Sequence, residues 1–209
     1  MPLGDRAVLV RFSDRLDLDA NAAAIGFARM LESARLTGIV EIAPNLVSVL
    51  VRYDPQKIGY SVLAGEIGLV GRADGGTASS PARTIAVSYG GNDGPDLESV
   101  ADLLGLDIAA FIAAHCAERL RVLSVGFAPG FIYCGMHGED MQIPRREAVR
   151  QAVPPGSVLF AARQTAIAAT TIPTGWSVIG RTRFINFDPT ANPPTHIRAG
   201  DRVVFEPAP

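Results

Sequence analysis

Lysine and cysteine are both scarce in this chain of 209 residues. Lys57 is the one lysine, and no Gly-rich loop of the G-x-x-x-x-G-K-[ST] type surrounds it, which excludes a phosphate-binding loop with its lysine. The same shortage excludes a biotinyl-lysine segment of the usual Met-Lys-Met kind. Cys116 and Cys134 are the two cysteines, and neither belongs to a C-x-x-C pair. The sequence therefore predicts neither a disulfide scaffold nor a structural zinc site.

Long apolar runs and a surplus of positive charge are also missing. The net charge is −2, so the chain lacks the basic footprint expected of a protein that binds nucleic acid or an anionic membrane. No apolar run approaches the roughly 20 residues needed to cross a bilayer, and the first residues do not resemble a signal peptide. We therefore expect a cytoplasmic protein that contacts neither nucleic acid nor a membrane.

Signatures of self-sufficient catalysis are absent from the sequence too. No G-x-S-x-G nucleophile elbow occurs. The three histidines, His115, His137 and His196, have no carboxylate or cysteine at metal-ligand spacing, so we expect no metal site. His115 follows Phe111 by one turn on the apolar face of a predicted helix, which is more typical of a hydrogen-bonded core histidine. It is still the best acid–base candidate of the three.

The first part of the chain has the pattern of a small α/β domain. Hydrophobic periodicity predicts strands over 6–12, 39–42 and 46–52 and helices over 18–36 and 62–70. One more strand would complete a ferredoxin-like split βαβ unit. Residues 71–82 contain no large apolar side chain and read as a linker, which gives one domain over 1–80 and a second over 81–209.

The second part changes character toward β-structure. A strand is predicted over 84–89, and Asp96 and Asp107 are each placed to cap a short helix. Beyond residue 119 short apolar segments recur every eight to twelve residues, broken by Pro and Gly, which is typical of a closed or rolled β-barrel. The clearest of these predicted strands are 121–125, 158–161, 177–179, 184–187 and 202–205.

Glycine, proline, aromatic and arginine residues are concentrated between 126 and 181. Glycines bring the backbone close to a ligand, aromatic rings can wall a pocket, and guanidinium groups suit a carboxylate or phosphate. On physical grounds alone, tight turns in a barrel with a solvated arginine rim explain the segment equally well. The candidate ligand-facing residues are Phe127, Pro129, Gly130, Phe131, Tyr133, Arg145, Arg146, Arg150, Gln164, Thr165 and Trp176.

Several motifs agree in order and spacing with one bacterial protein family. They include Leu3-Gly-Asp5, Val51-Arg-Tyr-Asp-Pro55, Tyr89, Asp93-Gly-Pro-Asp-Leu97, His115, Gly126-Phe-Ala-Pro-Gly-Phe-Ile-Tyr133, Pro144-Arg-Arg146, Arg150, Val153-Pro-Pro-Gly-Ser-Val158, Gln164-Thr165, Gly175-Trp176, Ile179-Gly-Arg-Thr182 and Gly200-Asp-Arg-Val203. In these motifs the chain resembles the family that contains the B subunit of ATP-dependent 5-oxoprolinase, the so-called allophanate hydrolase subunit 1 and the sporulation-kinase inhibitor KipI.

This resemblance implies an α+β protein in which a small ferredoxin-like α/β domain precedes a cyclophilin-like β-barrel. It implies a companion subunit with a related barrel, a third subunit in 5-oxoprolinase, and ATP-driven opening of 5-oxoproline to glutamate. From the residues themselves we expect neither a metal nor biotin on this chain, and the subunit that binds ATP is left open. In this setting His115 and Gln164 would be catalytic. Thr165 would help Gln164 to orient a carbonyl, and Arg145, Arg146 and Arg150 would hold an anionic group.

Three departures from the family pattern and two other functions keep the substrate open. Ala162-Arg163 replaces the family's Gly-Gly, Ala166-Ile-Ala-Ala169 replaces Gly-Ile-Tyr-Pro, and Pro173-Thr-Gly-Trp176 replaces Pro-Gly-Gly-Trp. A bulky cation at Arg163 and the loss of an aromatic at Ala168 would reshape one wall of the pocket. The alternatives are a carboxyltransferase component acting on urea or a related amide, and a non-catalytic inhibitor of a sensor histidine kinase.

Overall fold

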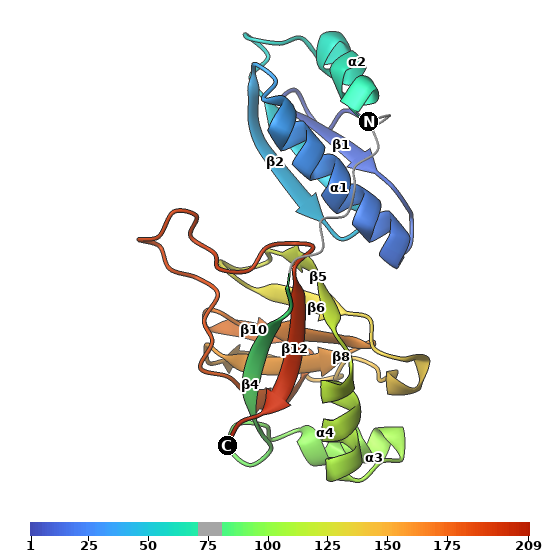
Figure 1. Cartoon of the computed structure of the whole chain (residues 1–209), viewed down its shortest axis with the longest axis vertical. Coiled ribbons are helices and arrows are strands. Elements are labelled where there is room, and N and C mark those ends of the chain that lie inside the picture. Colours follow the sequence, from blue (N-terminus) through green and yellow to red (C-terminus); the bar gives the residue numbers. More distant parts are fainter. Residues whose placement is uncertain (71–80) are drawn as a thin grey trace. The chain divides into compact units, whose positions relative to one another are not determined.

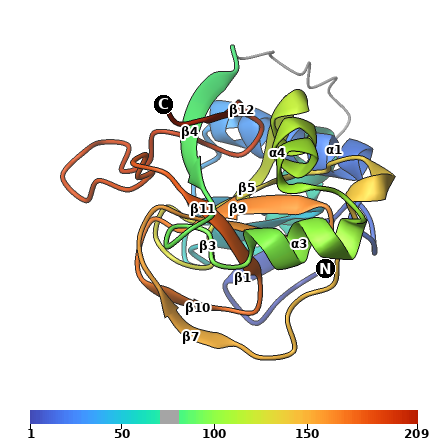
Figure 2. The same cartoon turned by 90° about the horizontal axis from the view of Figure 1, so that it is seen from below.

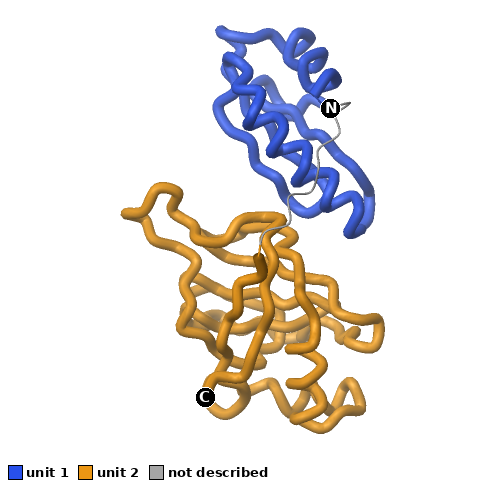
Figure 3. The backbone as a smooth tube through the Cα atoms, in the orientation of Figure 1, with its two compact units in different colours: residues 1–79 blue, residues 80–209 orange. Residues whose placement is uncertain are grey.

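The computed structural model describes residues 1–70 and 81–209, which form two compact units. The first unit is Met1–Ser79 and the second is Ser80–Pro209 (Figure 3). The linker that composition predicts over 71–82 falls, except for its last two residues, outside the described residues. The predicted class, a small α/β unit followed by a β-barrel, is confirmed.

The first unit is a three-stranded antiparallel sheet with two helices. Its sheet has the order β1-β3-β2, so β3 lies between the two strands that α1 connects, as in a split βαβ unit. The core forms where α1 packs Phe27 and Leu31 against Val49 and Val51. The elements are β1 (Ala7–Arg11), α1 (Leu18–Ala34), β2 (Ile39–Asn45), β3 (Ser48–Tyr53) and α2 (Tyr60–Val70) (Figure 1).

The outer edge of β1 is covered by the start of the chain. Leu9 N–H donates to the Met1 carbonyl at 2.9 Å, Leu3 N–H donates to the Ala7 carbonyl at 2.8 Å, and Pro2 bridges to Val8. Within residues 1–70 no fourth full strand completes the ferredoxin-like sheet, because this short return occupies the edge where such a strand would pair.

The second unit is a closed seven-stranded barrel with two helices and a two-stranded flap. The barrel order is β11-β4-β12-β5-β6-β9-β8, and β7 pairs with β10 in a separate sheet (Figures 1 and 2). The elements are β4 (Arg83–Tyr89), α3 (Leu97–Leu104), α4 (Ile108–Ala117), β5 (Leu120–Val125), β6 (Ile132–Gly135), the 3-10 turn Glu139–Met141, β7 (Arg150–Val153), β8 (Ser157–Ala161), β9 (Gln164–Ile167), β10 (Ile172–Thr174), β11 (Ser177–Arg181) and β12 (Arg202–Pro207).

Alternation along the barrel strands separates an interior core from an outer one. Val158 and Phe160 of β8 belong to the same core as Phe111 of α4 and Phe205 of β12. Leu159, between them in sequence, belongs to a second core on the other face of the same strand. This outer core contains Val153 of β7, Ile172 of β10, and the rings of Phe131 and Trp176.

Two local predictions are wrong in this unit. Residues 184–187 do not form a strand, because the buried Asn186 side chain bonds the backbone of His196 and Ile197 and holds the segment in a loop. Asp96 precedes α3 but makes no side-chain capping bond, because its carboxylate is used elsewhere. Asp107 caps α4 as predicted, accepting from Ala110 N–H at 2.7 Å.

Within the two described segments, no single helix is both long and apolar enough to span a bilayer. α3 and α4 would reach the length and composition only together, and they meet at a bend of 85°.

The turn between β8 and β9 is built from two residues in the left-handed region. Ala162 has φ 50° and Arg163 has φ 62°, and together they join the paired residues Ala161 and Gln164. A two-residue hairpin with positive φ at both central positions favours glycine, because a Cβ there is strained. The Gly-Gly of the family pattern therefore suits this turn better than the Ala162-Arg163 found here.

Replacing Ala162 with glycine should stabilise the barrel. The substitution removes the Cβ strain, and the gain exceeds the added flexibility of the unfolded chain, so we expect the free energy of unfolding to rise by roughly 0.5–1 kcal/mol. Denaturant unfolding followed by the fluorescence of Trp176, the single tryptophan, measures it in the second unit. Ala161→Gly, one residue earlier inside a strand, should destabilise by about 1 kcal/mol. A loss of stability in Ala162→Gly would contradict the strain.

Candidate functional site

The outer face of the barrel carries a continuous series of aromatic rings that ends in a cation. Phe127 and Phe131 have ring centroids 5.5 Å apart, Phe131 and Tyr133 4.7 Å, and Tyr133 and Trp176 5.9 Å. The Arg145 guanidinium lies 5.8 Å from the centroid of Trp176, within cation–π range. We call these five residues the outer aromatic strip.

Local backbone geometry explains how the strip is presented. β5 and β6 are joined by a tight loop, closed by bonds from Gly126 N–H to the Phe131 carbonyl and from Phe131 N–H to the Ala128 carbonyl. Phe127, at φ 78°, is 72% exposed, whereas Phe131 is buried. Gly130 has φ 71°, and a Cβ there would meet Phe187 at 2.6 Å. The glycine is therefore required where Pro129-Gly130 packs against the loop after β11.

Arg145 is the free cation of the strip. It is exposed, and among residues 1–70 and 81–209 no carboxylate lies within ion-pair distance of it. The neighbouring Tyr133 hydroxyl has its pKa raised by burial, and the Arg145 guanidinium partly opposes that rise. Tyr133 therefore stays a neutral hydrogen-bond donor beside a positive charge.

Arg146 and Arg150 share a buried counter-charge, Asp96. Arg146 Nη1 contacts Asp96 Oδ1 at 2.6 Å and Arg150 Nη2 contacts the same oxygen at 2.5 Å. The other carboxylate oxygen accepts from Val178 N–H at 2.8 Å. The three side chains form a cluster with one net positive charge. Because Arg146 and Arg150 are both paired with Asp96, their first role is structural.

Inside the barrel, two histidines share one hydroxyl. The Nε2 atoms of His115 and His137 each lie 2.8 Å from Thr165 Oγ1, and the two rings stack with centroids 5.0 Å apart. His115 Nδ1 lies 2.7 Å from the Tyr89 hydroxyl, which in turn lies 3.4 Å from Cys116 Sγ. His115, His137 and Thr165 are almost completely buried. We call these five residues the inner relay.

Proton counting limits how the inner relay can be bonded. Thr165 has a single hydroxyl proton, so it can donate to only one of the two histidines. If it donates to His137 Nε2, the ring proton of His137 is on Nδ1 and is unshared; if His137 Nε2 donates to Thr165, His137 Nδ1 is a free acceptor. His137 Nδ1 is buried and has no partner atom in either case.

Burial keeps every titratable member of the relay uncharged near neutral pH. Burial and then the neighbouring His137 hold the pKa of His115 well below its ordinary value. Burial and then Arg163 lower the pKa of His137 to about 4. Burial also raises the pKa values of Tyr89 and of Cys116. The relay is thus a neutral hydrogen-bonded network.

The structure divides the sequence-predicted site residues into three groups. Phe127, Phe131, Tyr133, Arg145 and Trp176 form the strip, with Pro129 and Gly130 in its supporting loop. Arg146 and Arg150 bind Asp96, while His115 and Thr165 face the interior, and Gln164 lies next to Thr165 on β9. The paired strand positions Gly135 with Gln164 and Cys134 with Thr165 place Gln164 at the β8–β9 turn.

Sequence reasoning missed four residues that the structure brings into these groups, namely Asp96 as an ion-pair partner, and Tyr89, Cys116 and His137. The sequence did contain one indication of an acidic partner such as Asp96. Arg146 and Arg150 are four residues apart, and a buried arginine needs a counter-charge. His137 follows a short strand with no periodic signal, and only the fold brings it beside His115.

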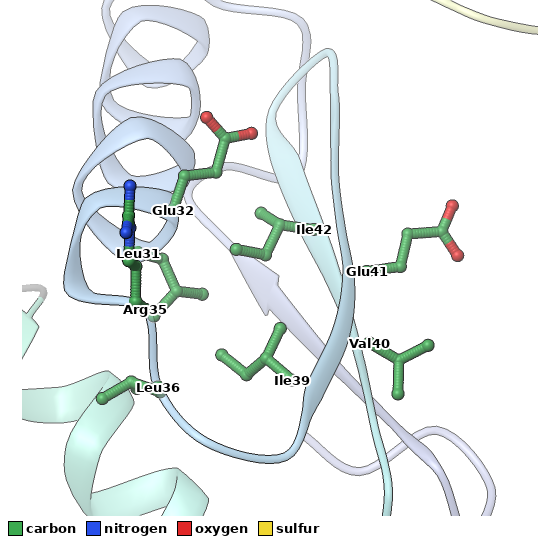
Figure 4. Close-up of a pocket in the computed structure, with 8 residues that line it drawn as sticks. All are labelled: Leu31, Glu32, Arg35, Leu36, Ile39, Val40, Glu41 and Ile42. Atoms are coloured by element: carbon green, nitrogen blue, oxygen red, sulfur yellow. The ribbon is translucent and has the colours of Figure 1, made fainter.

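Two smaller cavities offer little chemistry. A cavity of about 390 Å³ lies between the end of α1 and β2, with Leu31, Ile39 and Ile42 along it. Glu32 lies at its side, and the Glu41 side chain points to the far side of β2 (Figure 4). A cavity of about 150 Å³ beside Arg150 is lined by Arg181 and Ser157 as well. The part of the chain that the structure describes has no group of three or more His, Cys, Asp or Glu side chains that could hold a metal ion.

Comparison with known proteins assigns the family. Residues 1–197 match the family described as "Carboxyltransferase domain, subdomain C and D". The chain is 33% identical to the B subunit of 5-oxoprolinase from Bacillus subtilis over 97% of its own length and 90% of that protein. This chain belongs to the carboxyltransferase subdomain C and D family.

Solved structures carry the same fold within longer chains. The crystal structure of TTHA0988 matches 98% of this chain with a TM-score of 0.87 and 30% identity, but this chain covers 40% of it. Urea carboxylase of Kluyveromyces lactis matches 98% of the chain with a TM-score of 0.77 at 17% identity, over 21% of its own length. The second likeness shows the fold alone.

The inner relay predicts that the barrel loses stability in mild acid. An unfolded histidine binds a proton near its ordinary pKa of 6.5, whereas folded His137 binds one only near pH 4. The free energy of unfolding therefore has its full value above pH 6.5 and falls as the pH drops toward 4. The fall due to His137 is on the order of 3 kcal/mol. Unfolding free energies of the wild type and of His137→Gln between pH 4 and 7 measure this, and the variant should show a shallower fall. His196→Gln removes an exposed histidine and should keep the wild-type slope; equal slopes in all three proteins would contradict the prediction.

Asp96→Asn should destabilise the second unit far more than loss of a surface ion pair. It leaves Arg146 and Arg150 partly buried without a counter-charge, which we expect to cost roughly 3 kcal/mol. Glu41→Gln breaks the exposed Arg52–Glu41 pair, whose atoms are 2.8 Å apart, and should cost less than about 1 kcal/mol. Denaturant unfolding measures both losses. Equal losses would show that the Asp96 cluster stabilises the protein no more than the exposed Arg52–Glu41 pair does.

Proposed function

We propose that this chain is a subunit of an amide-hydrolysing enzyme of the 5-oxoprolinase type, which opens 5-oxoproline to L-glutamate at the expense of ATP. It would act with a companion subunit that carries a related barrel, and with a third subunit. The observation that carries the proposal is the match to the B subunit of 5-oxoprolinase from Bacillus subtilis along almost the full length of both chains.

The outer aromatic strip is the surface best suited to the substrate. A small cyclic amide with one carboxylate needs a flat apolar wall and a cation without its own counter-ion. The half-buried Tyr133 supplies the wall, backed by the buried Trp176, and Arg145 supplies the cation. Tyr133, kept neutral by burial, adds a hydroxyl donor for the lactam carbonyl.

Bond cleavage itself requires groups that this strip lacks. His115 is completely buried and the Thr165 hydroxyl is taken up by two histidines, so neither contacts a ligand on the outer face. We therefore assign them a positioning role, holding β9 and Gln164 in place, instead of the catalytic role expected of His115. The acid, the base and the activated phosphoryl group would come from the companion subunits.

ATP would also bind outside this chain. Lys57 is exposed and lies in the turn between β3 and α2, away from any Gly-rich phosphate loop. With no phosphate-binding loop around Lys57, we assign the phosphorylation step to a companion subunit and derive no step through ATP here.

Reconstitution tests the proposal. The chain, tagged and purified from its native host with the proteins that copurify, should convert 5-oxoproline to glutamate only in the presence of ATP, and the chain alone should be inactive. Arg145→Ala removes the proposed carboxylate anchor, so we expect KM for 5-oxoproline to rise at least about tenfold. Arg198→Ala, which changes an exposed arginine distant in sequence from the strip, is the matched control.

Three outcomes would overturn it. Lactam cleavage by the isolated chain would show that no companion is needed. A copurified complex that carries a biotinylated protein and turns over urea would favour a carboxyltransferase. Copurification of a sensor histidine kinase, without any lactam cleavage, would favour a regulatory role.

A further inference from the structure

One side of β4 is left open along most of its length. On the first side β12 runs parallel to it from Arg83 to Val87. On the second side β11 pairs at two positions only, Ser88 with Arg181 and Tyr89 with Gly180. Within the described segments no strand lies beside the earlier residues of β4 on that second side.

The open side exposes backbone hydrogen-bonding groups. The Val87 carbonyl accepts from Ala208 N–H on the β12 side, and successive residues of a strand point their polar groups to opposite sides. The N–H and C=O groups of Thr84 and Ala86 therefore face away from β12. Both residues are exposed, and no strand of the described segments pairs with them on that side.

A groove of about 900 Å³ runs along this edge. On its β4 side the side chains are small (Thr84, Ala86 and Ser88), which leaves room for another backbone to approach. The opposite side carries the exposed Arg181, Arg183 and Ile185 and the half-buried Phe184. We call this feature the β4 groove, and it shares no residue with the outer aromatic strip.

The charge of the β4 groove is positive. Arg181 and Arg183 have no carboxylate within ion-pair distance in the described parts of the chain. Arg83, at the start of β4, lies with its guanidinium 5.5 Å from the ring centroid of Phe184. Asp93 is the one acidic side chain of the lining, which also includes Ala208 and Pro209, so the lining side chains together carry one net positive charge.

The segment that follows β11 is held away from the groove. Thr182 is buried, and its N–H donates to the Gly156 carbonyl at 2.8 Å instead of to β4. Asn186 is completely buried and bonds the backbone of His196 and Ile197. Figure 2 shows the loop after β11 extending away from the barrel strands. The stretch Phe184–Phe187, although strand-like in sequence, therefore does not occupy the place beside β4.

We propose that the β4 groove binds an extended acidic segment of a partner protein, which adds to β4 as an antiparallel strand. We take the antiparallel direction because the added segment would lie in line with β11, which itself runs antiparallel to β4. At about 3.4 Å per residue the open edge holds roughly five residues. Main-chain bonds to Thr84 and Ala86 would give affinity, and acidic side chains on Arg181 and Arg183 would give specificity.

Fluorescence anisotropy with a labelled heptapeptide tests this. The probe is a peptide of alternating glutamate and valine, titrated with the full-length chain, and its matched control has lysine in place of glutamate. We expect the acidic peptide to bind at least about tenfold more tightly than the basic one, and its binding to weaken as salt is raised. Equal binding of the two peptides, or none by the acidic one, would overturn the proposal.

Two variants separate the backbone contribution from the charge contribution. Ala86→Pro removes the N–H that faces the groove while sparing the β12 side, and should weaken acidic-peptide binding at least about tenfold. Arg183→Glu should weaken it similarly, whereas Arg119→Glu, an exposed arginine outside the groove, should leave it unchanged. Near-ultraviolet circular dichroism checks that each variant is folded.

Binding that persists in a folded Ala86→Pro variant would overturn strand addition. Sedimentation of the chain alone is the last measurement, since self-association abolished by Ala86→Pro would make a second copy of this chain the occupant and overturn the acidic partner. The proposed lactam cleavage depends on the outer aromatic strip, whereas peptide binding depends on the β4 groove. The peptide experiment can therefore fail or succeed whether or not the reconstituted complex cleaves the lactam.

Discussion

The carboxylate of Asp96 is the interaction on which the candidate site depends. It joins the start of α3, the backbone of β11 at Val178, and two arginines from the segment that leads into β7. Arg145 precedes one of those arginines, and the Arg146 N–H donates to the Gly175 carbonyl next to Trp176. The ion-pair cluster therefore sets where Arg145 meets Trp176. The cost of burying a carboxylate is offset by two guanidinium groups and one N–H, an arrangement that only this combination of elements satisfies.

The outer aromatic strip and the inner relay are opposite faces of the same two strands. In the pairing of β6 with β9, Tyr133 lies opposite Ala166 on the outer face and Cys134 lies opposite Thr165 on the inner face. A change inside the barrel at Thr165 thus acts on the strands that carry Tyr133. This gives the buried histidines a role that fits their burial, because a rigid neutral network beneath a binding surface limits its movement without contacting the ligand.

Sequence patterns anticipated the parts of the fold that local physics controls. Alternation and helical spacing gave the split βαβ unit, the capped helix α4 and most barrel strands, since these depend on neighbouring residues. Asp96 has the sequence position of a cap, yet tertiary ion pairs claimed its side chain. Phe184–Phe187 has strand composition, yet Asn186 anchors it in a loop. The inner relay joins residues from β4, α4, β9 and the end of β6, and no periodicity in a single segment predicts such a meeting.

The structure shows where the residues that depart from the family pattern lie, and their positions bear on the substrate. Ala168 is completely buried in the outer core with Phe131 and Trp176, so an aromatic at that position would fill space directly beneath the strip. With alanine there, the wall formed by Tyr133 and Trp176 rests on smaller side chains. Arg163 turns its side chain inward, donating from Nε to the His137 carbonyl at 2.9 Å, and so braces the inner relay. The departure at Ala168 therefore alters the support of the proposed ligand wall. The departure at Arg163 replaces a glycine in a turn that favours glycine and adds a hydrogen bond to the inner relay.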